Sequence, residues 1–275
     1  MKQPFEIEWM GGAAEHHFRK ARPAVVDLPW GTLDPSKFSP AAVEYARGSW
    51  TEVAINEYRA VASFTEVLRA LVDVKAPLDL LGMTSDFLAD ECSHVELASR
   101  VAMELGGAAP RVVDMDRFAM RPRGLTALQR ANELVLRVGC IAEAFSGGTA
   151  SVSHEATTHP LTRAVYETIL RDEARHRRLG GLYFEWALAR IDETELARLG
   201  RVMHTALEGF APFWRPSAAA RDRAEIAPDD LQALGWLGAT RFAPVAREVV
   251  VRDILDPLAT IGITISDEQR AALLA

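Results

Sequence analysis

The chain has few cysteines and no long hydrophobic run. Cys92 and Cys140 are its two cysteines among 275 residues, so neither a disulfide framework nor a four-cysteine metal site is expected within it. No stretch approaches the roughly 20 uninterrupted apolar residues of a membrane span. The N-terminal residues include Glu6 and Glu8 and lack the apolar core of a secretory signal. We therefore expect a cytoplasmic protein that does not contact a membrane.

An excess of positive charge is also missing. The net charge is -7, whereas a domain that binds nucleic acid is usually basic overall. A nucleic-acid partner is therefore not expected. The composition, 49% hydrophobic and 25% charged, is typical of a globular protein, and the length suffices for one large helical domain with a sizeable core.

Hydrophobic periodicity predicts an all-α protein. Apolar residues recur every three or four positions along four long stretches and several shorter ones. The long helices are expected at about 41–74, 78–106, 127–150 and 161–190, and the shorter ones at about 193–212, 228–236, 239–255 and 266–274. Glycine and proline interrupt the first forty residues. The expected organisation is an irregular N-terminal leader over 1–40, a four-helix unit over 41–190 and C-terminal helices over 191–275 packed on that unit, all within one domain.

Two short motifs lie on the second and fourth long helices. The first reads Asp-Glu-Cys-Ser-His and ends at His94, and the second reads Asp-Glu-Ala-Arg-His and ends at His176. In each motif the Glu, Glu91 or Glu173, precedes the His by three residues, which places both side chains on one helix face. A carboxylate and an imidazole so placed can bind one metal ion together. One such pair arises by chance in many helices, but two pairs with the same preceding Asp indicate a metal site.

Two further glutamates are expected at the same height as these motifs. Residues at equal distance from the turn of an antiparallel hairpin lie level with each other. The midpoint between Glu57 and Glu91 abuts the first expected turn, and the midpoint between Glu143 and Glu173 lies within the second. Helical rise places both levels roughly 20–25 Å from their turns. Other glutamates fit less well: Glu52, Glu66 and Glu133.

Four carboxylates and two imidazoles would then face one another inside the protein. Burying four unpaired carboxylates would be very unfavourable, and two divalent cations would balance their charge. Carboxylate with imidazole suits iron or manganese. We therefore predict a pair of bridged metal ions, two Fe ions with Mn/Fe or Mn/Mn as alternatives. The predicted ligands are Glu57, Glu91, His94, Glu143, Glu173 and His176.

Three charged residues are predicted to support these ligands. Asp90 and Asp172 can each accept the far ring N–H of the His on the opposite helix, which would fix the tautomer of that imidazole. Arg175 is expected either to pair with one of these Asp residues or to reach solvent. The ligand-bearing faces also carry residues that would line a substrate pocket or simply belong to the core: Phe87, Ala98, Cys140, Gly147, Tyr166 and Ile169.

The order Glu, Glu-x-x-His, Glu, Glu-x-x-His resembles the ferritin-like di-iron carboxylate superfamily over about residues 41–190. The resemblance implies a ferritin-like four-helix bundle, here with additional C-terminal helices. The motif ending at His176 is similar to the Asp-Glu-x-Arg-His signature of bacterial multicomponent monooxygenases, although Ser93 stands where the first motif would carry the Arg. The spacing also resembles the p-aminobenzoate N-oxygenase group, which has an additional His where this chain has Ile169.

Other departures from the superfamily narrow the function. Ribonucleotide reductase small subunits place a radical Tyr where this chain has Ala98, so nucleotide reduction is not expected. Many hydroxylases and desaturases carry a Thr about one turn after the third-helix Glu, where this chain has Gly147 and Gly148. These glycines would leave room for a substrate or O2, or would allow close helix packing.

The resemblance implies a di-iron oxygenase that uses O2 and an electron donor to hydroxylate or N-oxygenate a small organic substrate. A ferroxidase or a rubrerythrin-like peroxide-scavenging protein is the alternative, although rubrerythrins usually carry an iron site with four cysteine ligands. A third hypothesis is a non-catalytic metal-bound scaffold whose C-terminal helices bind a partner. A homodimer is one option for the assembly.

Overall fold

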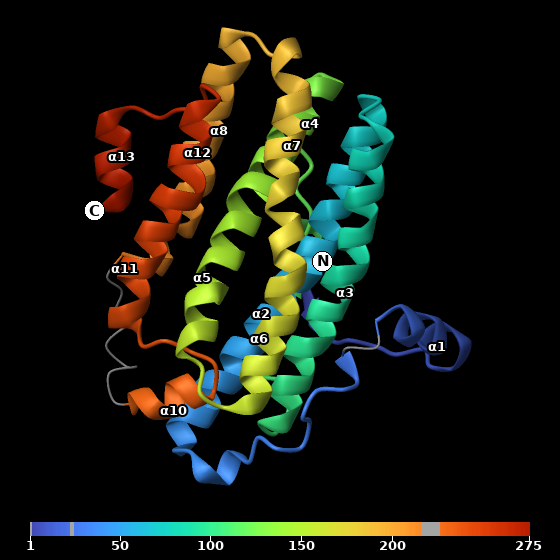
Figure 1. The fold of residues 1–275 in the computed structure, drawn as a ribbon, viewed down its shortest axis with the longest axis vertical. Helices are drawn as coiled ribbons and strands as arrows, with labels where there is room; N and C mark the ends of the chain where they lie inside the picture. The colour runs from blue at the N-terminus through green and yellow to red at the C-terminus, as the bar shows by residue number, and fades with distance from the viewer. Residues whose placement is uncertain (1, 23–24, 216–225) are drawn as a thin grey trace.

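The computed structural model describes residues 2–22, 25–215 and 226–275, and these residues are mostly helical (Figure 1). The described strands, β1 (Lys2–Pro4) and β2 (Val112–Asp114), form one short antiparallel pair. The expectation of an all-α protein is confirmed. Within the described part of the chain, no helix combines the length and the apolar composition needed to cross a membrane.

The first two long helices form a hairpin. Helix α2 spans Pro40–Asp73 and helix α3 spans Leu78–Glu104, and the two lie side by side (Figure 1). Ser39 caps α2, since its side chain accepts a hydrogen bond from the Ala42 N–H at 3.3 Å. At the turn between the helices, Lys75 takes a positive φ of 53°. This turn lies where the apolar period breaks in the sequence.

The third long helix contains a segment that the sequence did not reveal. Helix α4 (Ala127–Val135) continues through a π-helical segment, Leu136–Ala142, into helix α5 (Glu143–Ala156). A π segment widens the helix and often marks a functional site. Its last residue directly precedes Glu143, one of the expected ligands. A short turn then leads into helix α6 (Pro160–His176), which is followed by helix α7 (Arg178–Ala187).

The C-terminal part packs along the third long helix. Helix α11 and the π-helical segment that follows it contact α5, and all three lie on the same side of the molecule in Figure 1. The helices of this part are α8 (Glu193–Phe210), α10 (Pro228–Ala233), α11 (Ala239–Val249), the π segment Val250–Leu255, α12 (Asp256–Thr260) and α13 (Asp267–Leu274).

The first forty residues are not wholly irregular. Helix α1 spans Gly12–Ala21, buries none of its residues and lies to one side of the long helices (Figure 1). Its composition explains its formation, because alanine, glutamate, arginine and lysine all favour the helix. Its weak apolar period explains why the sequence did not predict it. Two arginines tie this segment to α3: Arg19 pairs with Glu96 and Arg22 pairs with Asp90.

A polar layer divides the apolar core. One apolar cluster, near the α2–α3 turn, includes Phe64 and Phe87, and another, toward the start of α2, includes Trp50 and Val101. Along α2 and α3, the expected ligands fall between these two clusters. A buried layer of charged side chains between two apolar clusters requires compensation for its charge.

Gly200 on α8 allows a test of how this helix packs against the segment that contains Thr264. A Cβ at Gly200 would lie 2.2 Å from the Thr264 backbone oxygen, whereas a Cβ at Gly209 on the same helix would meet nothing within 4 Å. We expect G200A to lower the free energy of unfolding by about 1–3 kcal/mol. The control G209A should be neutral or stabilising, by up to about 1 kcal/mol. Urea unfolding measures both, and an unchanged G200A would contradict this packing.

Candidate metal centre

Four long helices contribute the six expected ligands to one buried layer. Their ligand-type atoms form two overlapping groups, within each of which all atoms lie within 4.8 Å of one another. One group is Glu57, Glu91, His94 and Glu173, and the other is Glu91, Glu143, Glu173 and His176. Glu91 and Glu173 belong to both groups. The remaining Glu and His residues therefore fall into two Glu–His pairs, one on each side of the shared carboxylates.

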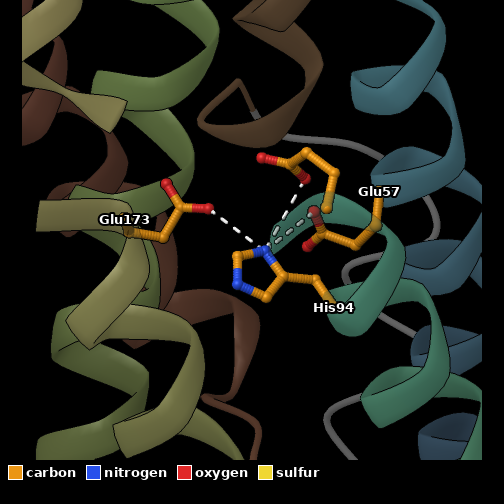
Figure 2. Close-up of side chains that lie close together, drawn as sticks. Glu57, His94 and Glu173 are labelled. Carbon is orange, nitrogen blue, oxygen red and sulfur yellow. Dashed lines mark ion pairs between the residues drawn. The ribbon is translucent and has the colours of Figure 1, made fainter. Parts of the chain in front are cut away.

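The first group converges on the His94 ring, as Figure 2 shows. His94 Nδ1 lies 3.8 Å from Glu57 Oε2, 3.6 Å from Glu91 Oε2 and 3.7 Å from Glu173 Oε1. Atoms that share one cation at about 2.1 Å lie about 3–4 Å from one another. The spacing around His94 is therefore that of ligands about a common ion.

The second group has a similar arrangement around His176. Its Nδ1 lies 3.0 Å from Glu91 Oε1, 3.3 Å from Glu143 Oε2 and 3.8 Å from Glu173 Oε1. The rings of Phe64 and Phe87 pack against this imidazole, with the Phe87 centroid 4.1 Å away. This side of the centre is therefore closed by aromatic carbon.

Several polar atoms of the layer make no hydrogen bond. These are both carboxylate oxygens of Glu91, one oxygen of Glu173 and both ring nitrogens of His94, and all three residues are buried. Buried polar atoms without partners are rare, since each forfeits the hydrogen bonds it makes in water. A cation bound among them would compensate. By donor type, spacing and lack of other partners, this group could hold a metal ion.

The pKa values of the carboxyl groups show the same need for positive charge. Burial raises the pKa of Glu57 and Glu173 well above its usual range, and neighbouring carboxylates add to both shifts. Burial also raises the pKa of Glu143. For Glu91 burial acts in the same direction, but the two nearby imidazoles outweigh it and lower the pKa to about 2. Carboxylates without a nearby cation are thus driven toward the neutral form.

The imidazoles respond in the opposite sense. Burial lowers the pKa of His176, but Asp90, Glu143 and Glu91 outweigh it and raise the pKa to about 12. Burial is likewise overcome at His94, whose pKa is raised well above its usual value by Asp172 and Glu91. Protons therefore supply the positive charge when no metal ion does, and a metal ion must displace them.

The two Asp residues lie behind the imidazoles, each on the opposite helix. His94 Nε2 is 3.5 Å from Asp172 Oδ2, and His176 Nε2 is 3.3 Å from Asp90 Oδ2. Arg175 contacts both carboxylates, at 3.0 Å from Asp90 Oδ2 and 2.9 Å from Asp172 Oδ1. With Nε2 facing a carboxylate, each ring presents Nδ1 to the centre.

Arg22 is a member of this network that the sequence did not reveal. Its Nη2 lies 3.1 Å from Asp90 Oδ1, so Asp90 is shared among Arg22, Arg175 and His176. Arg22 follows α1 in a stretch without periodic pattern, and no motif pointed to it. Arginines near the ends of helices are common, so the sequence provided no reason to assign Arg22 to the metal centre.

The three glutamates that fitted the height argument less well are bound elsewhere. Glu52 pairs with Arg111 and Glu66 pairs with Arg121 at the surface. Glu133 binds Arg198 at 2.6 Å. Each has an arginine partner outside the layer, and this accounts for its charge without a metal ion.

The six residues considered for a pocket lie in different surroundings. Ala98 and Ile169 lie in the apolar cluster around Trp50, and the buried Tyr166 donates its hydroxyl hydrogen to the Gly235 carbonyl at 2.8 Å. Phe87 covers His176, as described above. Cys140 lines a surface groove, and burial raises the pKa of its thiol to about 12. Gly147 lies against the side chain of Arg177.

The Asp90 contact allows a prediction about metal affinity. D90N keeps the shape of the side chain but removes the charge facing His176 and Arg175, so metal affinity should fall about 10–100-fold. Asp86 is exposed on the same helix, and D86N is the matched control. Competition with a chelator of known affinity measures both variants. Equal affinities in D90N and D86N would show that Asp90 does not support the ligand.

Comparisons with known proteins assign no family to this chain. No family model matches it, and no curated protein or solved structure is significantly similar to it. What characterises the chain is therefore its own geometry: a buried group of Glu and His side chains, in a mostly helical protein, that could hold a metal ion.

Proposed function

We propose that the chain is a di-iron oxygenase with a ferritin-like four-helix bundle, cytoplasmic in location. Glu91 and Glu173, which belong to both ligand groups, would hold the iron together with Glu57 and His94 on one side and Glu143 and His176 on the other. The observation that carries the proposal is that two ligand groups overlap in two carboxylates. Iron bound there would supply the reduction of O2 for oxygenation of a small organic substrate, with electrons from an external donor.

The protein's own residues would hold and orient this centre. The four carboxylates balance the charge of two divalent ions. Asp90 and Asp172 face the far nitrogens of His176 and His94 at 3.3 and 3.5 Å. With a metal ion bound, they would keep the proton on each Nε2 and leave each Nδ1 lone pair for the ion. Arg175 joins the two Asp residues and thereby couples the positions of the two imidazoles.

Glu57 is the ligand most open to solvent. Its side chain is 12% exposed, whereas the side chains of the two imidazoles are fully buried. Apolar packing around His176 excludes water from the opposite side. We infer that O2 reaches the centre on the Glu57 side.

A ferroxidase or peroxide-scavenging activity is the second candidate. The groove beside the centre favours it. Ala144, Ala174 and Arg177, which follow three of the ligands in the sequence, line this groove, but none of the six ligands does. A buried centre suits reactants as small as O2, peroxide or Fe(II). A metal-bound scaffold would react with none of them.

Oxygen consumption separates these functions. The chain is loaded anaerobically with Fe(II), supplied with a chemical reductant and exposed to O2, with and without candidate organic substrates. An oxygenase transfers labelled oxygen from O2 to the organic compound. A ferroxidase instead oxidises Fe(II) in excess of the resident ions without a labelled product. An iron-loaded chain that reacts neither with O2 nor with peroxide would overturn both proposals.

A further inference from the structure

A groove lies between the third and fourth long helices and the C-terminal part of the chain. Its volume is about 540 Å³, within the range of about 300–1,000 Å³ typical of small-molecule sites. The residues that matter for its chemistry are Cys140, Arg177, Arg178, Phe184, Arg252 and Leu258. It is thus formed where α12 and the π segment before it lie beside α5, α7 and the π segment Leu136–Ala142.

The groove is positively charged in a protein of net charge -7. Arg177, Arg178 and Arg252 all line it, and its acidic lining residue is Asp253. Arg252 binds that carboxylate through two contacts of 2.8 Å. The side chains of Arg177 and Arg178 have no ion-pair partner among the described residues. Two guanidinium groups at one groove, without carboxylate partners, favour binding of an anion.

The interior of the groove is apolar. Phe184 and Leu258 are buried in its walls, and the Cys140 thiol faces Gly180. A Cβ at Gly180 would lie 2.2 Å from Cys140 Sγ, so the third and fourth helices nearly touch here. The groove therefore combines charged residues with an apolar lining.

This lining is close to the metal centre. Gly180 follows His176 by four residues on the fourth long helix, and Gly139 precedes Glu143 by four residues on the third. The lining also includes Ala144, Ala174 and Arg177, each of which directly follows an expected ligand in the sequence. A Cβ at Gly139 would lie 3.4 Å from the Gly180 nitrogen and 3.7 Å from Leu179 Cδ2, so the two helices are closely packed here. About one helical turn thus separates the groove from two ligands.

We propose that the groove binds a small organic acid, with its carboxylate on Arg177 and Arg178 and its apolar body toward Cys140 and Phe184. The Arg177 side chain lies along Gly147, where a Cβ would come within 3.1 Å of Arg177 Cδ, so the glycine leaves room for this arginine at the groove. That the acid is the substrate of the metal centre rests on the proposed function. The binding itself does not.

Calorimetric titration of the full chain tests the site, with octanoate as the probe and octanamide as its neutral counterpart. We expect octanoate to bind the original chain and to bind the double variant R177Q/R178Q at least about tenfold more weakly, through loss of charge-assisted hydrogen bonds. Octanamide should bind weakly to both. Arg201 is exposed on α8, and among the described residues its side chain makes no ion pair. R201Q, outside the groove, should bind octanoate normally.

Equal octanoate affinity in R177Q/R178Q and R201Q, or octanamide affinity equal to that of octanoate, would overturn the site. Both arginines are exposed, so the double variant should fold, and the single variant R178Q provides the same comparison if it does not. The outcomes also separate this site from the proposed function. If the chain binds octanoate but no metal ion, the proposed function is overturned and the acid-binding site is not. If the chain binds metal ions but binds octanoate and octanamide equally well, the acid-binding site is overturned and the proposed function is not.

Discussion

E173Q is expected to abolish binding of both metal ions, whereas E143Q is expected to leave roughly one ion bound per chain. The difference follows from the geometry, because Glu173 belongs to both ligand groups and Glu143 to one. Removing a shared carboxylate deprives each ion of a ligand and leaves the remaining charges unbalanced. E57Q should resemble E143Q, since Glu57 also belongs to one group.

Substitution by glutamine should change metal binding without destabilising the fold. The pKa of Glu173 is raised mainly by burial, so the metal-free chain favours a neutral side chain at this position and E173Q should fold at least as stably. Glu167 is exposed on the same helix, with its side chain 56% exposed, and E167Q is the control. Elemental analysis after anaerobic Fe(II) loading and desalting gives the number of iron ions bound per chain in each variant. Full metal content in E173Q would refute the shared-ligand arrangement.

Chelation of the metal is expected to lower the Tm by about 5–10 °C near pH 8. A ligand at one hundred times its Kd stabilises the folded state by about 2.7 kcal/mol, and 1 kcal/mol corresponds to about 2–4 °C in a chain of roughly this size. The effect should shrink toward pH 5, because metal binding must displace protons from the carboxyl and imidazole groups.

The metal-free chain should itself become less stable as the pH rises. The carboxyls of Glu57, Glu143 and Glu173 have raised pKa values in the folded chain. In the unfolded chain the same carboxyls release their protons at about pH 4.3. The free energy of unfolding therefore falls as the pH rises from about 4.3 toward the raised pKa values. His176 acts in the same sense: its contribution is fully present below about pH 6.5 and is lost as the pH rises toward about 12.

Glu91 opposes this trend only in acid. Its pKa of about 2 means that its contribution is present above about pH 4.3 and is lost as the pH falls toward 2. The metal-free chain should therefore be more stable at pH 5 than at pH 8. Thermal unfolding at both pH values, with and without chelator, measures these effects. A chelated chain that is more stable at pH 8, or a chelator without effect at either pH, would contradict the account.

The long helices and their turns could be predicted because their signals are local. Ser39 and Thr126 cap α2 and α4, as Ser and Thr commonly do, and the turns lie where the apolar period breaks. The comparison of heights across each turn needed only a uniform helical rise between ligand and turn. The π segment before Glu143 did not disturb it, because that segment lies on the far side of Glu143 from the turn.

Features that depend on tertiary packing could not be predicted. The π segment has no local sequence signal, and it contains Gly139, which closely approaches Gly180 on another helix. Tyr166 and Ile169 lie on the ligand-bearing helix, as expected, but the aromatic cluster around Trp50 fills the space beside them. The groove depends on where the C-terminal helices dock, and the periodicity of those helices does not specify that.

The metal content of the protein purified without added metal tests the central claim most directly, together with anomalous scattering from its crystals. The account predicts about two transition-metal ions per chain, each bound to both Glu91 and Glu173, with His94 on one ion and His176 on the other. Fewer than one ion per chain, with the carboxylates of Glu91 and Glu173 far apart, would contradict it.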